Sequence, residues 1–287
     1  MDELLKFADM ALYESKSEGS NTYNFYNAEL DSSMRRKAEI IFNLKKAIEN
    51  NEIYLEYQPQ FNIKQNKITG VEALMRWKNK KLGYIPPSDF IPVAEETGYI
   101  IELGKWLIEN AFNMCCKLNK NGNPLAMSLN ISSIQLEDRN LLDFIRHNLK
   151  KYEIPPSLIK FEVTESQVIV PNKRNIKILN EIASLGIGII IDDFGTGYSS
   201  ISYIARFPIE EIKIDKLFIH MLEKNKKIEA VIDIIIKMSK CLGISVTAEG
   251  IETKSQFEKL KEMSCDTIQG FYIGKPMAAD DIISKVL

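Results

Sequence analysis

Histidine and paired cysteines are scarce in this chain, and their scarcity excludes several kinds of site. Only His147 and His220 occur among the 287 residues, so a histidine-rich zinc site, a Ser/His/Asp triad and a histidine general base are poor candidates. None of the four cysteines shows CxxC spacing. The adjacent Cys115 and Cys116 suit the buried face of a helix, and we expect all four cysteines to be inert core thiols in a reducing compartment.

Long apolar runs and an excess of one charge are lacking as well. No apolar run approaches the roughly 18 residues that span a bilayer, and the N-terminus has no basic patch before an apolar stretch, so no signal peptide is expected. The 37 basic and 39 acidic residues leave a net charge of −2, which offers no broad footprint for nucleic acid. With 45% hydrophobic residues, we expect a soluble, cytoplasmic globular protein that contacts neither a membrane nor polymeric nucleic acid.

The first 27 residues differ in pattern from the rest. Apolar residues recur at helical spacing between residues 4 and 12, Gly19 ends that pattern, and the aromatic residues around Phe25 predict a short strand or tail. A polar, charged helix is expected to follow and to link two units. We therefore predict an N-terminal segment at 1–27, a linker helix at 28–50 and one domain at 51–287.

Within 51–287, short β-rich segments alternate with amphipathic helices. The predicted strands lie near 53–57, 70–76, 126–131, 159–164, 187–192, 211–214, 245–249 and 267–271. Such alternation implies parallel pairing through right-handed crossovers, and about eight strands imply closure, so the predicted fold is an α/β, (β/α)8 TIM-like barrel. A short polar turn joins the first two strands, which favours an irregular, antiparallel first strand. The alternative is an open doubly wound sheet, which no GxGxxG motif supports.

Nearly every predicted strand ends in a polar side chain, on the face where barrel enzymes carry their chemistry. These residues are Glu72, Asn130, Glu162, Asp192, Asp193, Lys213, Glu249 and Gln269. Any one of them alone is readily explained as a solvated strand end or a helix cap. Carboxylates at the same position of several strands are harder to explain in that way. They would repel one another in one mouth of the barrel, so protonation or bound metal must neutralise them.

The types of these side chains indicate which metal fits. Carboxylate and amide oxygens without cysteine or histidine select Mg²⁺ or Mn²⁺ rather than zinc. The adjacent Asp192 and Asp193 would let one carboxylate bridge two ions, an arrangement that suits in-line displacement at phosphorus. From the residues alone we therefore predict a metal-dependent phosphoester hydrolase. The loop that starts at Phe194 has two glycines in three positions, and it is either a turn that caps the next helix or a mobile lid.

The same residues, in this order, resemble the EAL-domain family of cyclic di-GMP phosphodiesterases. The matching motifs are EAL from Glu72, LNIS around Asn130, EVTE from Glu162, DDFGTGYSS from Asp192, KID from Lys213, AEGIE from Ala248 and QGF from Gln269. The resemblance covers the chain from about Glu52 to the C-terminus. It implies a (β/α)8 barrel with an antiparallel first strand, which hydrolyses cyclic di-GMP to linear pGpG in bacterial second-messenger signalling.

The resemblance also implies a role for each site residue. It assigns one Mg²⁺ or Mn²⁺ ion to Glu72, Asn130, Glu162 and Asp192, and a second to Asp192 and Asp193. It assigns the attacking water to Lys213 and Glu249, with Glu249 as base or acting through the metal and Gln269 as a positioning group. The remaining assignments are Arg76 to the substrate phosphate, Gln58 to the substrate base, Glu252 to the substrate site, and Glu165 to the anchoring of the DFGTG loop.

Other interpretations stay open at this point. Degenerate members of the family bind the dinucleotide without cleaving it, so a catalytically silent receptor that acts through a protein partner is the main alternative; the full ligand set favours the enzyme. Another class of barrel enzyme, such as a Mg²⁺ lyase that forms an enolate, is disfavoured because this chain has no pair of lysines at its predicted strand ends. Residues 1–27 resemble the end of a GGDEF diguanylate cyclase domain without its signature loop. They are either a remnant of that domain or a helix that packs a homodimer.

Overall fold

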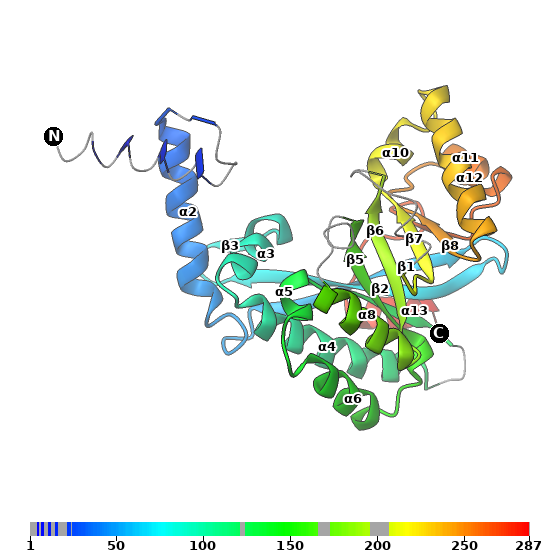
Figure 1. Cartoon of the computed structure of the whole chain (residues 1–287), viewed down its shortest axis with the longest axis horizontal. Coiled ribbons are helices and arrows are strands. Elements are labelled where there is room, and N and C mark those ends of the chain that lie inside the picture. The colour runs from blue at the N-terminus through cyan, green and yellow to red at the C-terminus, as the bar shows by residue number, and fades with distance from the viewer. Residues whose placement is uncertain are drawn as a thin grey trace. The chain divides into compact units, whose positions relative to one another are not determined.

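The computed structural model describes residues 25–120, 124–165, 173–195 and 207–286, together with isolated positions before residue 24 (Figure 1). The chain forms two compact units. One comprises Met1–Glu52 and Trp77–Tyr99, and the other comprises Ile53–Arg76 and Ile100–Leu287. All the predicted site residues belong to the second unit.

The second unit is built on a closed sheet. Its strands are β1 (Ile53–Asn62), β2 (Lys67–Asn79), β4 (Ala126–Asn130), β5 (Ile159–Thr164), β6 (Gly188–Phe194), β7 (Glu211–Ile214), β8 (Ser245–Ala248) and β9 (Thr267–Gln269). They pair in the order β1-β9-β8-β7-β6-β5-β4-β2, and a further pairing of β1 with β2 closes the ring. The successive pairs from β2–β4 through β8–β9 are parallel, whereas β1 is antiparallel to β9, with Gln60 opposite Gln269. The predicted barrel with an antiparallel first strand is confirmed.

Helices cover this sheet on the outside. They are α4 (Ile100–Leu118), α5 (Ser133–Leu136), α6 (Leu141–Lys151), α8 (Lys173–Ser184), α10 (Lys216–Met221), α11 (Lys226–Cys241), α12 (Lys254–Glu262) and α13 (Ala279–Val286), with the short 3-10 turn η1 (Pro156–Leu158) before β5. Helix α4 packs on β4, α8 on β6 and α11 on β8. In α4, a stripe of buried residues at four-residue spacing faces the sheet: Leu103, Leu107, Ala111 and Cys115.

The strands are buried on both faces, as expected for a sheet inside a shell of helices. Strand β6 begins with four buried residues, and its polar residues Asp192 and Asp193 follow only at its end. The expectation that all four cysteines are core thiols is wrong for two of them. Cys115 and Cys265 are buried, but Cys116 is half-buried and Cys241 is exposed at the end of α11, where the helix turns its outer face to solvent.

The first unit contains α2 (Ala28–Leu44), β3 (Gly83–Ile85), α3 (Pro87–Glu96) and the last residues of β2. The Trp77 ring packs edge-on against Phe90, and the Glu52 carboxylate accepts hydrogen bonds from Trp77 Nε1 at 3.2 Å and Asn79 Nδ2 at 2.8 Å. The helix expected over 28–50 ends at Leu44 and is followed by turns. The division of the chain at residues 27 and 50 stays a prediction.

Most of the predicted helix in the first 20 residues lies outside the described residues. Its described positions, from Leu5 to Lys16, are helical, whereas Tyr23 and residues 25–27 belong to no strand. Of the two predicted alternatives, a short strand or a tail, the described positions match the tail. Over the parts of the chain that the structure describes, no helix combines the length and the apolar character needed to cross a membrane.

Candidate functional site

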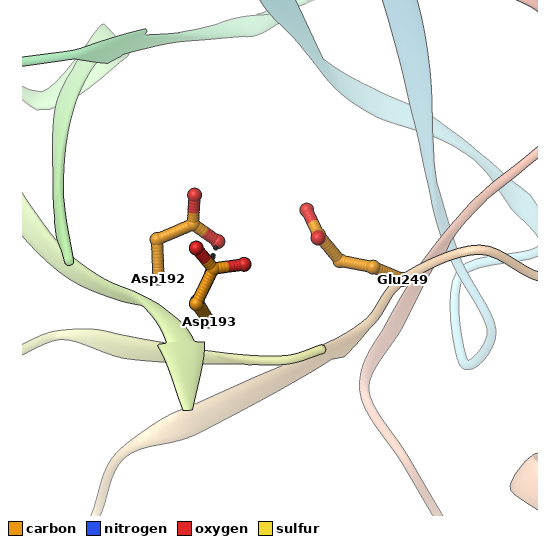
Figure 2. A group of neighbouring side chains, drawn as sticks. All are labelled: Asp192, Asp193 and Glu249. Atoms are coloured by element: carbon orange, nitrogen blue, oxygen red, sulfur yellow. Dashed lines mark hydrogen bonds between the residues drawn. The ribbon is translucent and has the colours of Figure 1, made fainter. Parts of the chain in front are cut away.

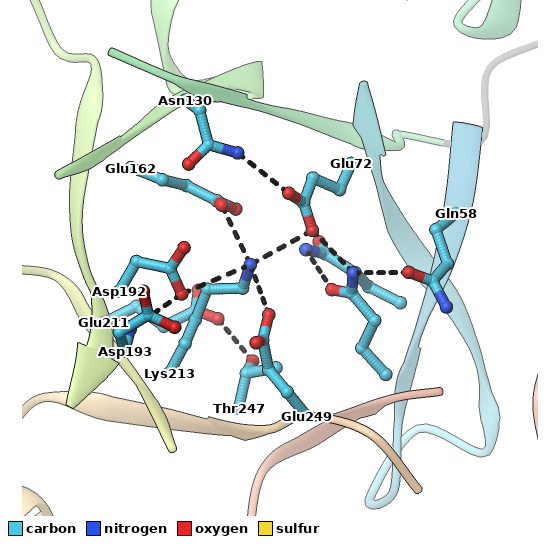
Figure 3. Close-up of polar contacts among 12 residues, drawn as sticks. Gln58, Glu72, Asn130, Glu162, Asp192, Asp193, Glu211, Lys213, Thr247 and Glu249 are labelled. Carbon is cyan, nitrogen blue, oxygen red and sulfur yellow. Dashed lines mark hydrogen bonds and ion pairs between the residues drawn. The ribbon is translucent and has the colours of Figure 1, made fainter. Parts of the chain in front are cut away.

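A buried lysine stands at the centre of the polar strand ends. Lys213 on β7 is fully buried, and its Nζ lies 2.6 Å from Glu249, 2.8 Å from Glu162, 3.1 Å from Glu72 and 3.8 Å from Asp192. Figure 3 shows these carboxylates converging on the ammonium group from different strands. We call these five residues the Lys213 cluster. The predicted convergence of acidic residues from distant stretches of sequence is therefore present.

The charges of the Lys213 cluster determine whether the Lys213 side chain is protonated. Burial would lower the pKa of Lys213, but attraction to Asp192, Glu162, Glu249 and Glu72 raises it well above its ordinary value. The lysine side chain therefore stays charged although it is fully buried. One cation set among four carboxylates still leaves an excess of negative charge, which is costly in a buried site unless protons or a further cation neutralise it.

Glu72 and Glu162 respond differently to the same cation. Burial would raise the pKa of Glu72, but Lys213 and hydrogen bonds from Gln269 and Asn130, at 2.5 and 2.9 Å, lower it overall. Burial and the neighbouring Glu72 carboxylate raise the pKa of Glu162 well above its ordinary value, because only Lys213 opposes them. The second oxygen of Glu162, Oε1, is buried and has no hydrogen-bond partner among the described residues. An orphaned carboxylate oxygen inside an acidic cluster suits a metal ligand.

Asp192, Asp193 and Glu249 form a second acidic group at the mouth of the barrel (Figure 2). One oxygen of each carboxylate lies within 4.8 Å of the others. Burial, followed by the charges of Asp192 and Asp215, raises the pKa of Asp193 to about 6. Burial, opposed by Lys213 and reinforced by Asp192 and Glu72, raises the pKa of Glu249 to about 8. An all-oxygen group of this kind, beside the orphaned Glu162 oxygen, fits a hard divalent cation such as Mg²⁺ or Mn²⁺.

An irregularity in β6 brings the two adjacent aspartates together. Successive side chains of a regular strand point to opposite faces of the sheet. Here the pairing of β6 with β7 shifts register between Ile191 and Phe194, and Asp193 adopts a left-handed backbone with φ of 55°. Its N–H donates to Asp192 Oδ1 at 2.9 Å. Both carboxylates consequently reach the same group, which regular alternation would not allow.

The antiparallel side of the barrel supplies amide groups to the site. Gln269 Nε2 donates to Gln58 Oε1 at 3.1 Å as well as to Glu72, and its own oxygen accepts from Gln60 Nε2 at 3.0 Å. On the same side, Arg76 Nε pairs with Glu56 Oε2 at 2.8 Å. The three glutamines therefore border the Glu72 side of the Lys213 cluster with neutral amide groups.

Two further predicted residues have different surroundings. Glu165 Oε2 accepts a hydrogen bond from the backbone N–H of Gly195 at 2.8 Å, the contact that the predicted anchoring of the loop requires. A Cβ at Gly195, whose φ is 98°, would lie 2.9 Å from the ring of Phe218. Residues 196–200 of that loop lie outside the described residues. Glu252 is mostly exposed, and its carboxylate lies 3.8 Å from His220 Nε2 instead of joining the Lys213 cluster.

Sequence reasoning did not single out four polar residues near the site: Glu56, Gln60, Glu211 and Thr247. Glu56 and Gln60 stand two residues before and after Gln58 on β1, and Glu211 and Thr247 stand two residues before Lys213 and Glu249. The period of two in a β-strand places such residues on the same face. That period was the available signal for all four.

With the geometry established, comparisons with known proteins identify the family. The sequence model described as "EAL domain" matches residues 42–276. The chain belongs to the EAL-domain family. It is 41% identical over 275 residues to the signaling protein YkoW of Bacillus subtilis, covering 96% of this chain and 34% of YkoW. It is 35% identical over 285 residues to the bifunctional diguanylate cyclase/cyclic di-GMP phosphodiesterase MucR of Pseudomonas aeruginosa, covering 99% of this chain and 42% of MucR.

A solved structure supports the same assignment. The structure described as "PaMucR Phosphodiesterase, c-di-GMP complex" superposes with a TM-score of 0.81 and 35% sequence identity, covering 85% of this chain and 99% of that chain. The EAL-domain barrel is therefore shared with a phosphodiesterase whose structure is described as a c-di-GMP complex. This chain spans about a third to two fifths of the length of the curated relatives named above, from 34% to 42%.

Proposed function

We propose that this EAL-domain chain hydrolyses cyclic di-GMP at one phosphodiester to linear pGpG, with two Mg²⁺ or Mn²⁺ ions as cofactors. The observation that carries the proposal is the meeting of Glu72, Glu162, Asp192, Asp193 and Glu249, which come from four strands or strand ends, at one mouth of the barrel. The kinship with cyclic di-GMP phosphodiesterases supplies the substrate. When bound, the ions would activate water and stabilise the charge that develops on the phosphate oxygens.

Four residues are proposed to hold the first ion: Glu72, Asn130, Glu162 and Asp192. The orphaned Oε1 of Glu162 supports this, because it needs a positive partner. Asp192 and Asp193 are proposed to hold the second ion, which the close approach of their oxygens supports. Glu249 lies within the same 4.8 Å group, so the geometry also allows it to act as a ligand there.

Lys213 and Glu249 are proposed to handle the attacking water. Glu249 is the candidate base, since burial raises its pKa to about 8 and a group with a pKa near the working pH accepts and releases protons efficiently. The Lys213 ammonium holds the Glu249 carboxylate at 2.6 Å and would orient it. Gln269, which touches both Glu72 and Gln58, is proposed to position the water between metal ligands and substrate.

Substrate contacts are proposed for Arg76 and Gln58. The planar guanidinium of an arginine can donate two parallel hydrogen bonds to a phosphate, and Arg76 is already paired with an anion, Glu56. Gln58 is proposed to meet the guanine base and Glu165 to anchor the loop after Asp193. Glu252 is proposed as a substrate-site residue on the family resemblance alone.

A turnover assay tests the proposal. Purified protein is incubated with cyclic di-GMP in metal-free buffer and with Mg²⁺, Mn²⁺ or Ca²⁺, and the nucleotides are separated by chromatography. We expect pGpG with Mg²⁺ or Mn²⁺ and none without metal. Tight binding of the dinucleotide without turnover, under every metal condition and with an intact fold, would favour the alternative of a receptor that acts through a protein partner.

A further inference from the structure

A second layer of polar side chains lies beneath the Lys213 cluster, one step nearer the beginnings of the strands. Three residues of this layer each stand two positions before a member of the cluster: Lys160 before Glu162 on β5, Glu211 before Lys213 on β7, and Thr247 on β8 before Glu249, which directly follows that strand. Because side chains alternate along a strand, both members of each pair face the interior, about 7 Å apart along the strand.

Glu211 joins these three strands. Its Oε2 accepts a hydrogen bond from Lys160 Nζ on β5 at 2.6 Å, and its Oε1 accepts one from the hydroxyl of Thr247 on β8. Glu211 is 5% exposed and Thr247 is fully buried. Figure 3 shows the contact between Glu211 and Thr247 directly beside Lys213 and Glu249. One carboxylate therefore ties β5, β7 and β8 together under the site.

The absence of a side chain at Gly188 leaves space for the ion pair between Lys160 and Glu211. Strand β6 lies between β5 and β7, and its Gly188 is the pairing partner of Lys160. A Cβ at Gly188 would lie 3.1 Å from Lys160 Cγ and 2.7 Å from Glu210 Oε2. The missing side chain thus leaves room for Lys160 to cross β6 and reach Glu211, with Glu210 at 3.4 Å as a second partner.

This layer is unusual for a barrel interior, which branched apolar side chains normally fill. A buried ion pair is weak evidence for stability, because desolvation offsets its attraction. The ion pair between Lys160 and Glu211 has a clearer effect on the position of the Lys213 side chain. Glu211 stands two residues from Lys213 on one strand, so without a partner it would compete with the Lys213 cluster for the ammonium group. Lys160 neutralises Glu211 and leaves Lys213 to the carboxylates above it.

We propose that Glu211, clamped between Lys160 and Thr247, is a positioning residue that fixes where Lys213 and Glu249 stand at the mouth of the barrel. The inference rests on the proposed phosphodiesterase activity for its kinetic readout only. The described side-chain partners of Glu211 lie on β5 and β8, next to the residues proposed to handle metal and water. Gln58 and Arg76, proposed to bind substrate, lie on β1 and β2. Loss of the clamp should therefore lower kcat and leave KM nearly unchanged.

A pair of substitutions at residue 247 tests the clamp with little change in volume. Thr247→Val removes the hydroxyl and keeps the shape, whereas Thr247→Ser keeps the hydroxyl. We expect Thr247→Val and Glu211→Gln to lower kcat by about tenfold or more, as is usual when a group that orients a metal ligand is lost, with KM within about twofold of the wild type. Thr247→Ser should retain most of kcat, and Lys160→Met should behave like Glu211→Gln.

Mn²⁺ binding, measured by calorimetry without substrate, separates this inference from the proposed function. We expect Mn²⁺ to bind about fivefold or more weakly to Thr247→Val than to Thr247→Ser. If the wild type cleaves no cyclic di-GMP, the proposed function fails and the Mn²⁺ affinities alone decide the inference. Equal kcat and equal Mn²⁺ affinity for the two residue 247 variants, even with a lower Tm for Thr247→Val, would overturn it. If Glu211→Gln does not fold, the residue 247 pair still gives the answer.

Discussion

Lys213 Nζ lies 2.6 Å from Glu249 Oε1, the shortest of its four carboxylate contacts. This buried cation is the main source of positive charge in the site that the structure describes. It makes the carboxylates tolerable while no divalent ion neutralises them, and it ties the candidate base to the candidate metal ligands.

Lys213→Met should destabilise the metal-free protein. Removing one partner of a buried ion pair leaves uncompensated charge, which costs about 3–5 kcal/mol of unfolding free energy. Mn²⁺ should restore much of that loss, since an ion that binds only the folded state stabilises it by mass action. Thermal unfolding with and without Mn²⁺ measures both effects. A variant as stable as the wild type in metal-free buffer would show that Lys213 does not neutralise the cluster.

Glu249→Gln should slow turnover while sparing the fold. The substitution keeps the size and polarity of the side chain but removes the base, which costs about 10² or more in rate. Cyclic di-GMP binding in Ca²⁺, measured by calorimetry, should change little, because Gln58, and not Glu249, is the residue proposed to contact the guanine base of the substrate. Glu262→Gln, on the exposed side of α12, is the matched control and should behave like the wild type. A wild-type rate for Glu249→Gln would remove Glu249 from the proposed chemistry.

Much of this barrel could be predicted from the sequence. The bounds of β5 and β7 match the predicted segments 159–164 and 211–214, because short apolar runs with a polar end are typical of barrel strands. The convergence of Glu72, Glu162 and Asp192 followed from topology alone, since parallel strands in a closed sheet end at one mouth. Helix α10, with six residues, is too short to show a helical period in the sequence.

Backbone irregularity and contacts between strands were harder to predict. Asp193 has φ of 55°, a conformation that no local pattern demands of an aspartate in a strand, and it turns the side chain toward Glu249. Glu211 is the first residue of β7 and Thr247 lies within β8. At such positions sequence alone does not distinguish a polar layer beneath a site from a solvent-facing edge. Their roles depend on which strands are neighbours, and that is a property of the closed sheet.

The affinity for Mn²⁺ should rise between about pH 6 and 8. Asp193 and Glu249 have pKa values raised to about 6 and about 8, so an ion must displace protons at lower pH, and binding should release them. Calorimetry in buffers of different ionisation enthalpy measures the number of protons released. An affinity independent of pH over this range would contradict protonation of either carboxyl.

The same shifts predict how stability depends on pH without metal. A carboxyl whose pKa is higher in the folded chain binds its proton more tightly there, so its protonated form favours the folded state. The free energy of unfolding should therefore fall as pH rises from the ordinary values of 3.8 and 4.5 through about 6 for Asp193 and about 8 for Glu249. The raised pKa of Lys213 acts in the same direction, but only above its ordinary value of 10.5, where the unfolded chain begins to lose a proton that the folded chain keeps. Saturating Mn²⁺ should flatten the curve, which Tm measurements over pH will test.

Arg76→Lys should weaken substrate binding more than it slows chemistry. The Arg76 guanidinium is held at 2.8 Å by Glu56, with the two side chains 13% and 30% exposed, so it is aimed before the substrate arrives. Lysine keeps the charge but loses the two-pronged donor geometry. Losing one charge-assisted hydrogen bond to phosphate costs about 1.5 kcal/mol, or about tenfold in affinity. We expect KM to rise by that factor with kcat within about twofold. Arg146→Lys, exposed on α6, is the matched control, and an unchanged KM for Arg76→Lys would remove Arg76 from the phosphate site.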